Sequence, residues 1–165
     1  MKVNLINRQD DIILNLDFIQ KVSTYISDKF DEDSRCEANL ILVSSSDIRQ
    51  INNQYRQVDA ATDVISFSYL FEKDREDIKK DIENGKQKHG FYTIGEIIIC
   101  PRVAEDNALE QGKDWNLNLE ICLLIIHGFL HIYDYDHEVE DDRAVMFKKQ
   151  DSILEDVIRT FNLQP

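Results

Sequence analysis

Three of the four histidines in this 165-residue chain are close together in the sequence, at positions 127, 131 and 137. Histidines four residues apart on a helix project from one face, about 5–6 Å apart at Cβ, so His127 and His131 can reach the same metal ion. The segment between His131 and His137 is rich in Asp and Tyr, which favour a turn that brings His137 back toward that ion. The spacing therefore predicts a metal site with these three histidines as ligands.

Three histidines with no thiolate nearby leave one coordination position open, as in catalytic rather than structural zinc sites. Zinc lowers the pKa of bound water to about 7 and polarises phosphoryl or carbonyl oxygens. A purely structural role for His127 and His131 is disfavoured, because burying each without a partner costs about 1–3 kcal/mol. We therefore expect one Zn²⁺ per chain and a hydrolytic enzyme. His89, the remaining histidine, lies in a charged segment without ligand spacing and is expected in a solvated loop.

The histidine spacing also matches the metzincin pattern H-E-x-x-H-x-x-G-x-x-H, so a zinc metalloprotease is the alternative from another substrate class. In that pattern the glutamate is the general base. Gly128 occupies its position here and has no side chain to accept a proton. Peptide hydrolysis would therefore lack its usual general base.

Several segments resemble the YbeY family of small bacterial, metal-dependent, single-strand-specific endoribonucleases. Residues 127–137, HGFLHIYDYDH, are similar to the family signature H-G-x-L-H-x-x-G-Y-D-H. Residues 52–67, NNQYRQVDAATDVISF, resemble the block L-N-x-x-Y-R-x-x-D-x-x-T-D-V-L-S-F. Residues 95–99 resemble its G-D-I strand, and residues 146–154 its M-x-x-x-Q-x-x-I-L tail. The resemblance covers most of the chain, with the motifs in the expected order.

Three positions depart from the family pattern. Asp134 replaces a glycine, Glu96 replaces an aspartate, and Ser68 stands where a proline often follows S-F. Aspartate tolerates the left-handed backbone better than most residues, so Asp134 is expected to keep the turn between the second and third histidines.

The resemblance implies that the protein cleaves single-stranded RNA and acts in 3′-end maturation of 16S (small-subunit) rRNA and in ribosome quality control. It also gives Arg56 a catalytic role, because a guanidinium can hold a phosphate or stabilise charge developing on it. The other interpretation of Arg56 is a surface salt bridge. A nonenzymatic ribosome-assembly factor with a structural metal is a third reading of the chain. The general base stays open, since each candidate carboxylate can equally be structural: Asp59, Asp63, Glu96 and Asp136.

The net charge of −13 has the wrong sign for whole-molecule attraction to nucleic acid. We expect modest, salt-sensitive RNA affinity and delivery by a protein partner such as a ribosomal protein or an assembly GTPase, and no binding to DNA. A local positive groove is possible if the fold gathers four cations: Arg49, Arg56, Arg102 and Lys113.

The length predicts one domain spanning residues 1–165. The apolar run Ile121–Ile126 is far shorter than the roughly 18 residues a membrane span needs, and the N-terminus lacks an apolar signal segment, so we expect no membrane association and a cytoplasmic location. Three widely spaced cysteines predict free buried thiols.

Hydrophobic periodicity predicts four strands, near residues 3–6, 39–43, 62–67 and 95–100. It predicts helices over 12–30, 47–56, 101–111, 117–133 and 146–161, with the apolar fourth helix packed inside the fold and carrying His127 and His131. Residues 72–88 read as a solvated excursion. The expected class is α/β (α+β), with about five helices, and the resemblance implies one mixed four-stranded sheet.

Overall fold

A computed structural model describes residues 1–30, 35–70, 84, 92–135 and 140–164, and places one mixed four-stranded sheet at the centre of the chain. The strand order is β1-β2-β4-β3. The bounds are Lys2–Asn7 for β1, Cys36–Leu42 for β2, Val64–Ser68 for β3 and Tyr92–Ile99 for β4. The first three strands in this order run parallel, and β3 pairs antiparallel with β4 at the edge. The predicted pairing of segments 62–67 and 95–100 is confirmed.

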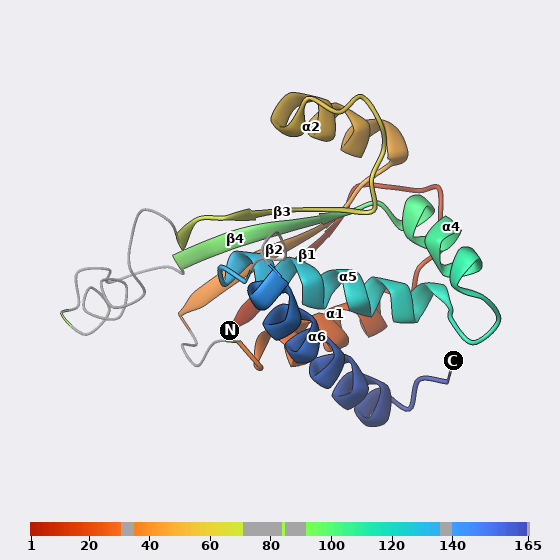
Figure 1. Cartoon of the computed structure of the whole chain (residues 1–165). Helices are drawn as coiled ribbons and strands as arrows, with labels where there is room; N and C mark the ends of the chain where they lie inside the picture. Colours follow the sequence, from red (N-terminus) through yellow and green to blue (C-terminus); the bar gives the residue numbers. More distant parts are fainter. Residues whose placement is uncertain (31–34, 71–83, 85–91, 136–139, 165) are drawn as a thin grey trace.

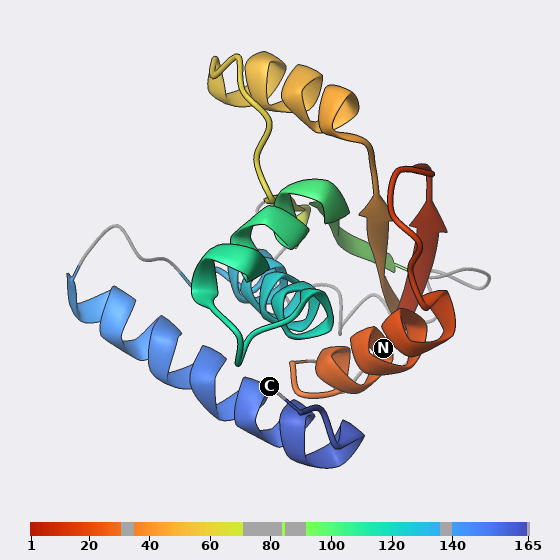
Figure 2. The same ribbon diagram turned by 90° about the vertical axis from the view of Figure 1, so that its right-hand side faces the viewer.

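Five helices are described, and they lie on both faces of the sheet (Figures 1 and 2). Their bounds are Leu16–Ser27 for α1, Ser45–Arg56 for α2, Pro101–Gln111 for α4, Leu117–Ile132 for α5 and Glu140–Phe161 for α6. Helix α2 lies on one face, and α1, α5 and α6 lie on the other, with α4 packed beside α5. The predicted fold class is confirmed.

The core has two parts, one on each face of the sheet. The larger part joins the sheet to α1, α5 and α6, and includes the fully buried Phe129, Ile97 and Leu40. The smaller part lies under α2 and includes Ile48 and Ile65. Helix α5 packs against β3, β4 and three helices, which explains why its sequence is apolar on nearly every side.

Local signals fix several element ends. The Ser44 hydroxyl accepts a hydrogen bond from the Asp47 backbone N–H and begins α2. Gly112, with φ of 104°, ends α4. Helix α6 begins at Glu140, earlier than its apolar pattern predicts, because residues 142–145 of the first turns are exposed and carry no core-facing stripe.

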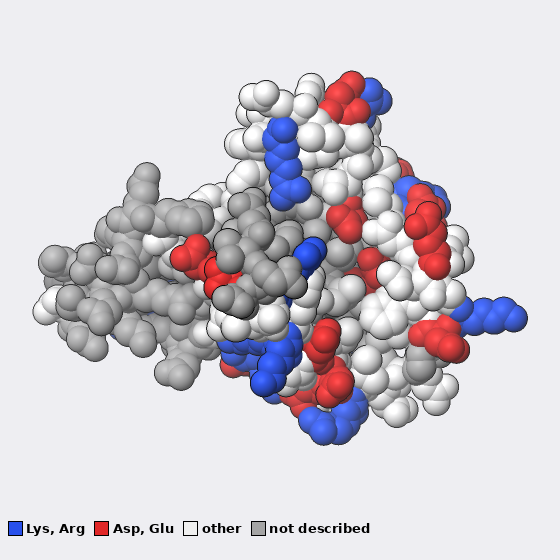
Figure 3. Space-filling view, viewed as in Figure 1, with Lys and Arg blue, Asp and Glu red and all other residues white. Residues whose placement is uncertain are grey.

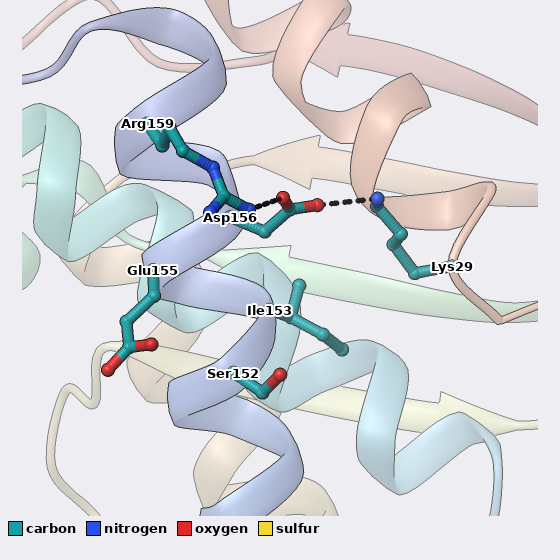
Figure 4. Close-up of a pocket in the computed structure, with 6 residues that line it drawn as sticks. All are labelled: Lys29, Ser152, Ile153, Glu155, Asp156 and Arg159. Atoms are coloured by element: carbon teal, nitrogen blue, oxygen red, sulfur yellow. Dashed lines mark hydrogen bonds and ion pairs between the residues drawn. The ribbon is translucent and has the colours of Figure 1, made fainter.

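An ionic contact fastens α6 to the end of α1. The Asp156 carboxylate accepts hydrogen bonds from Lys29 Nζ at 2.5 Å and from Arg159 Nη2 at 2.6 Å (Figure 4). It also accepts one from Tyr25 Oη at 2.6 Å. These hydrogen bonds hold the pKa of Asp156 far below its usual range, and the bond from Lys29 has the largest effect. A hollow of about 310 Å³ lies beside this contact, lined by Lys29, Ser152, Ile153, Glu155, Asp156 and Arg159.

The three cysteines are buried thiols that form no disulfide, as predicted. Burial raises the pKa of the Cys122 thiol to about 12, so this thiol stays protonated. Within the described ranges, no helix is both long and apolar enough to cross a membrane. The predicted excursion at 72–88 and His89 lie outside the described residues, apart from residue 84.

Candidate metal centre

Helix α5 brings His127 and His131 together. The side-chain oxygen of Asn116 accepts hydrogen bonds from the backbone N–H groups of Asn118 and Leu119 and so begins the helix. One turn separates the two histidines, and their rings meet edge to face with centroids 4.6 Å apart. Their Nε2 atoms lie 3.1 Å from each other. The two imidazoles are therefore neighbours on one face of α5.

The Nε2–Nε2 distance suits a shared metal ion. Two nitrogen ligands, each about 2.0–2.1 Å from a tetrahedral zinc ion, lie about 3.3 Å apart. The 3.1 Å between His127 and His131 is close to this value. The same distance also suits a hydrogen bond when one nitrogen carries a proton. The donor set thus fits zinc, provided that both Nε2 atoms present lone pairs.

Gln150 on α6 contacts the other ring nitrogen of His127. Its Oε1 lies 3.1 Å from Nδ1 of His127. An amide oxygen only accepts hydrogen bonds, so Nδ1 carries the proton and Nε2 of the neutral ring carries the lone pair. Gln150 is 9% exposed. A buried polar partner on the second nitrogen is the usual means of orienting a metal-binding histidine.

The third predicted ligand, His137, lies outside the described residues, as does Asp136. Among the residues that are described, no group of three or more His, Cys, Asp or Glu side chains is placed to hold a metal ion. The turn that leads toward His137 is described as far as Tyr135. Asp134 has φ of 65°, which confirms that aspartate keeps the left-handed backbone in place of the family glycine.

Gly128 is required by packing between α5 and the sheet. A Cβ atom at this position would lie 2.6 Å from Cγ2 of Ile97, which is 1% exposed and cannot readily move. Position 128 therefore faces the buried side of β4, whereas the histidines at positions 127 and 131 are only partly buried. A glutamate here would meet the sheet. This finding agrees with the inference that the protease base is missing.

Arg56 is the last residue of α2, on the opposite face of the sheet from α5 (Figure 1). It is exposed, and within the described part of the chain it makes no hydrogen bond or ion pair. The described residues therefore give no support to the interpretation of Arg56 as a surface salt bridge. Arg49, seven residues earlier on the same helix, does pair with Asp59, with 2.7 Å between Nε and Oδ1.

The four cations proposed to line a positive groove are not a free basic cluster. Arg49 is engaged by Asp59 and Arg102 by Glu105. Lys113 lies in the turn after α4. Figure 3 shows basic side chains scattered among acidic ones on the face that it presents. A groove built from Arg49, Arg56, Arg102 and Lys113 is not supported.

The described candidate carboxylates have structural contacts. Asp59 binds Arg49, which lowers the pKa of Asp59. Asp63 accepts from Asn107 Nδ2 at 3.1 Å and from the Val64 backbone N–H at 2.7 Å, at the start of β3. Glu96 accepts from Asn39 Nδ2 at 3.0 Å. In the described part of the chain, these contacts occupy each carboxylate away from the two histidines.

Two buried polar residues on α5 and α6 were not singled out from the sequence. Glu120 lies two turns before His127 on α5, is 4% exposed, and accepts a hydrogen bond from Trp115 Nε1 at 2.6 Å. Burial raises the pKa of Glu120 above its usual value. Gln150 lies on the apolar stripe of α6 between Met146 and Leu154. In both cases the signal in the sequence is a polar residue at a core-facing position.

Comparisons with known proteins agree with this architecture. The family described as Endoribonuclease YbeY matches residues 4–158. A protein named Endoribonuclease YbeY from Francisella tularensis subsp. novicida is 36% identical over 146 residues, covering 88% of this chain and 82% of that protein. One from Clostridium botulinum (strain Loch Maree / Type A3) is 31% identical, covering 95% and 96%. The solution structure of TM1509 from Thermotoga maritima has a TM-score of 0.61 and 26% identity, covering 97% of this chain and 91% of that one.

Proposed function

This chain belongs to the Endoribonuclease YbeY family, and from that premise we propose that it is a zinc-dependent endoribonuclease that cleaves single-stranded RNA. The observation that carries the proposal is the meeting of His127 and His131 Nε2 atoms at 3.1 Å, with Nδ1 of His127 held by Gln150. We place its action in 3′-end maturation of 16S rRNA and in ribosome quality control, in the cytoplasm. The resemblance of the motifs supports this assignment.

His127, His131 and His137 would hold the ion, one per chain. A bound zinc ion supplies a Lewis acid and a source of hydroxide near neutral pH. Gln150 keeps the proton of His127 on Nδ1, so that Nε2 is presented. Arg56, which has no ion pair among the described residues, would bind the scissile phosphate and stabilise charge that develops on it.

The metalloprotease alternative is weaker, because position 128 faces Ile97 and leaves no space for a catalytic glutamate side chain. The remaining alternative is an assembly factor whose metal is structural. The net charge of −13 favours help from a ribosomal protein or an assembly GTPase in bringing the protein to small-subunit rRNA.

Metal content and two substrates test the proposal. Protein purified without added metal is compared with His131→Ala and with His89→Ala, which removes the one histidine outside the motif. We expect about one zinc per chain in the wild type and in His89→Ala, and loss of both zinc and cleavage of single-stranded RNA in His131→Ala. Cleavage of casein would support the protease instead. Bound zinc with neither activity would leave the assembly factor.

A second experiment isolates Arg56. Arg56→Ala should keep its zinc and lower kcat for RNA cleavage by about 10²-fold or more, the usual cost of removing a donor to developing charge. Arg49→Ala, on the same helix but paired with Asp59, should retain activity. Equal turnover by wild type and Arg56→Ala would remove Arg56 from the reaction.

A further inference from the structure

Three aromatic side chains gather near the β3 edge, on the face of the sheet that carries α2. Tyr55 at the end of α2 packs against Phe67 of β3, with ring centroids 4.8 Å apart and planes at 64°. Tyr69 follows β3, and its backbone N–H donates to the Ile94 oxygen at 2.9 Å, so that the pairing with β4 continues and Tyr69 shares a face with Phe67, two residues earlier. Burial and the Glu96 carboxylate raise the pKa of Tyr69. Tyr55 is 60% exposed and Tyr69 is 48% exposed. We call Tyr55, Phe67 and Tyr69 the aromatic patch.

The aromatic patch lies across one strand from the histidine pair. Side chains alternate along β3, so Phe67 faces α2 and Ser68 faces α5. The Ser68 hydroxyl donates to the backbone oxygen of Ile132 at 2.9 Å, and Ile132 follows His131. In the described sheet, β3 is the terminal strand on this side. An extended chain that crosses this edge can therefore touch both the aromatic patch and the histidine region.

The charges around the aromatic patch differ on its two sides. Arg56 follows Tyr55 and is exposed without an ion pair among the described residues. Glu96 lies opposite Phe67 in the β3–β4 register and is partly buried beside Tyr69. A carboxylate repels phosphate and accepts hydrogen bonds from the N–H groups of bases. A nucleic-acid strand placed here would turn its bases to the sheet and its phosphates toward Arg56.

We propose that the aromatic patch is a base-stacking subsite for single-stranded RNA, on which unpaired bases lie against Tyr55 and Tyr69 on their way to the histidine pair. This inference rests on the proposed function. Stacking on exposed aromatic rings binds any unpaired base and needs little net positive charge, which suits a chain with a net charge of −13. A duplex encloses its base faces and presents phosphates, so the patch selects against it.

The test measures binding of fluorescein-labelled, short single-stranded RNA by anisotropy, with zinc-loaded full-length protein. Phosphorothioate linkages slow cleavage, and ordinary RNA is used in parallel for cleavage. Tyr55→Leu and Tyr69→Leu keep apolar bulk but remove the ring. Each should weaken binding by roughly 5- to 150-fold, the range for one stacked base, with an unchanged salt dependence. Tyr55→Phe and Tyr69→Phe should bind as the wild type does. Phe147→Leu, at an exposed aromatic on α6, is the matched control and should have no effect.

Arg56→Ala, unlike the tyrosine variants, should change the salt dependence of binding. The slope of log K against log salt concentration should become shallower by about 0.7, because one phosphate of the single strand is no longer neutralised. If both leucine variants bind like the wild type while the wild type cleaves RNA, the aromatic patch is not an RNA subsite, although the proposed function stands. Equal weakening by Phe147→Leu would also overturn the subsite. A wild type that neither binds nor cleaves RNA would overturn the proposed function and this inference with it.

Discussion

Replacing Gln150 by leucine would remove the amide oxygen that lies 3.1 Å from Nδ1 of His127. Leucine has similar bulk and suits the apolar stripe of α6, so the exchange mainly removes a hydrogen-bond acceptor. Without that acceptor, the proton of His127 is free to move to Nε2, which is then unable to bind a metal ion. We expect the fold to persist and zinc binding to weaken.

The expected loss of zinc affinity follows from the role of Gln150 as the hydrogen-bond partner of His127. Removing the group that orients a metal-binding histidine typically costs 10- to 100-fold in metal affinity, which is about 1.4–2.7 kcal/mol. Gln150→Glu keeps an oxygen acceptor at the same distance from the backbone, so it should bind zinc at least as tightly as the wild type. The two variants together separate the hydrogen bond from the volume of the side chain.

Zinc affinity is measured by competition with a chromophoric chelator, which reports on the metal and not on catalysis. The same exchange at the exposed Gln54 of α2 is the control and should leave the affinity unchanged. Wild-type zinc affinity in Gln150→Leu, at an unchanged melting temperature, would refute the reasoning that Gln150 sets the tautomer of His127.

Three further predictions concern stability. Gly128→Ala gains about 1 kcal/mol of helix propensity but overpacks against Ile97, which costs about 1–3 kcal/mol, so chemical denaturation should show net destabilisation. The cost of Gly128→Ala should be smaller in an Ile97→Ala background, which lacks the three side-chain atoms nearest to the new Cβ. Asp156→Asn should lower the melting temperature at pH 7, because a carboxylate whose pKa is depressed in the folded state stabilises that state at any pH above its pKa in the unfolded chain, about 3.9. The difference in melting temperature between Asp156→Asn and the wild type should shrink as the pH falls from about 3.9 toward the folded-state pKa. Burial raises the pKa of Glu120, which penalises the folded state above about pH 4.3, so Glu120→Gln should melt higher than the wild type at pH 7 and equally near pH 4.

Each of these has an outcome that contradicts it. A more stable Gly128→Ala would mean that Ile97 moves easily and that packing does not explain the glycine. A difference between Asp156→Asn and the wild type that stays constant from neutral pH to well below the unfolded pKa would rule out the ionised carboxylate as the cause. A less stable Glu120→Gln at pH 7 would mean that its contacts with donors outweigh the cost of burying the charge.

The sequence was sufficient for the elements of this fold wherever the apolar pattern and the end signals agree. The predicted helices over 47–56 and 101–111 match α2 and α4 to within two residues, and the apolar stretch 117–133 predicts the buried helix α5. The beginning of α6 was not predictable from the pattern, since its first turns face solvent. Which helix covers which face of the sheet follows from long-range contacts, and no local pattern encodes those.

The candidate site was predictable to a different degree for each residue. Spacing on one helix determines that His127 and His131 meet, so the sequence is enough. Gln150 is on α6 and His127 is on α5, so only the packing of these two helices reveals their contact. The local sequence allowed Arg56 to be either a phosphate-binding residue or part of a surface salt bridge. The structure bears on this choice, because the nearby carboxylate of Asp59 binds Arg49 and not Arg56. Partner choice among surface charges depends on side-chain positions that no spacing rule supplies.

Gly128 matters for both the chemistry and the packing of α5. In the sequence it matters for what is missing, the carboxylate of a metalloprotease. In the structure it has a positive cause, because α5 approaches β4 so closely that a Cβ atom would lie 2.6 Å from Ile97. The close approach holds the helix that presents His127 and His131 against the centre of the sheet. A return to the protease pattern would therefore need a wider spacing between helix and sheet, and not simply a new side chain at position 128.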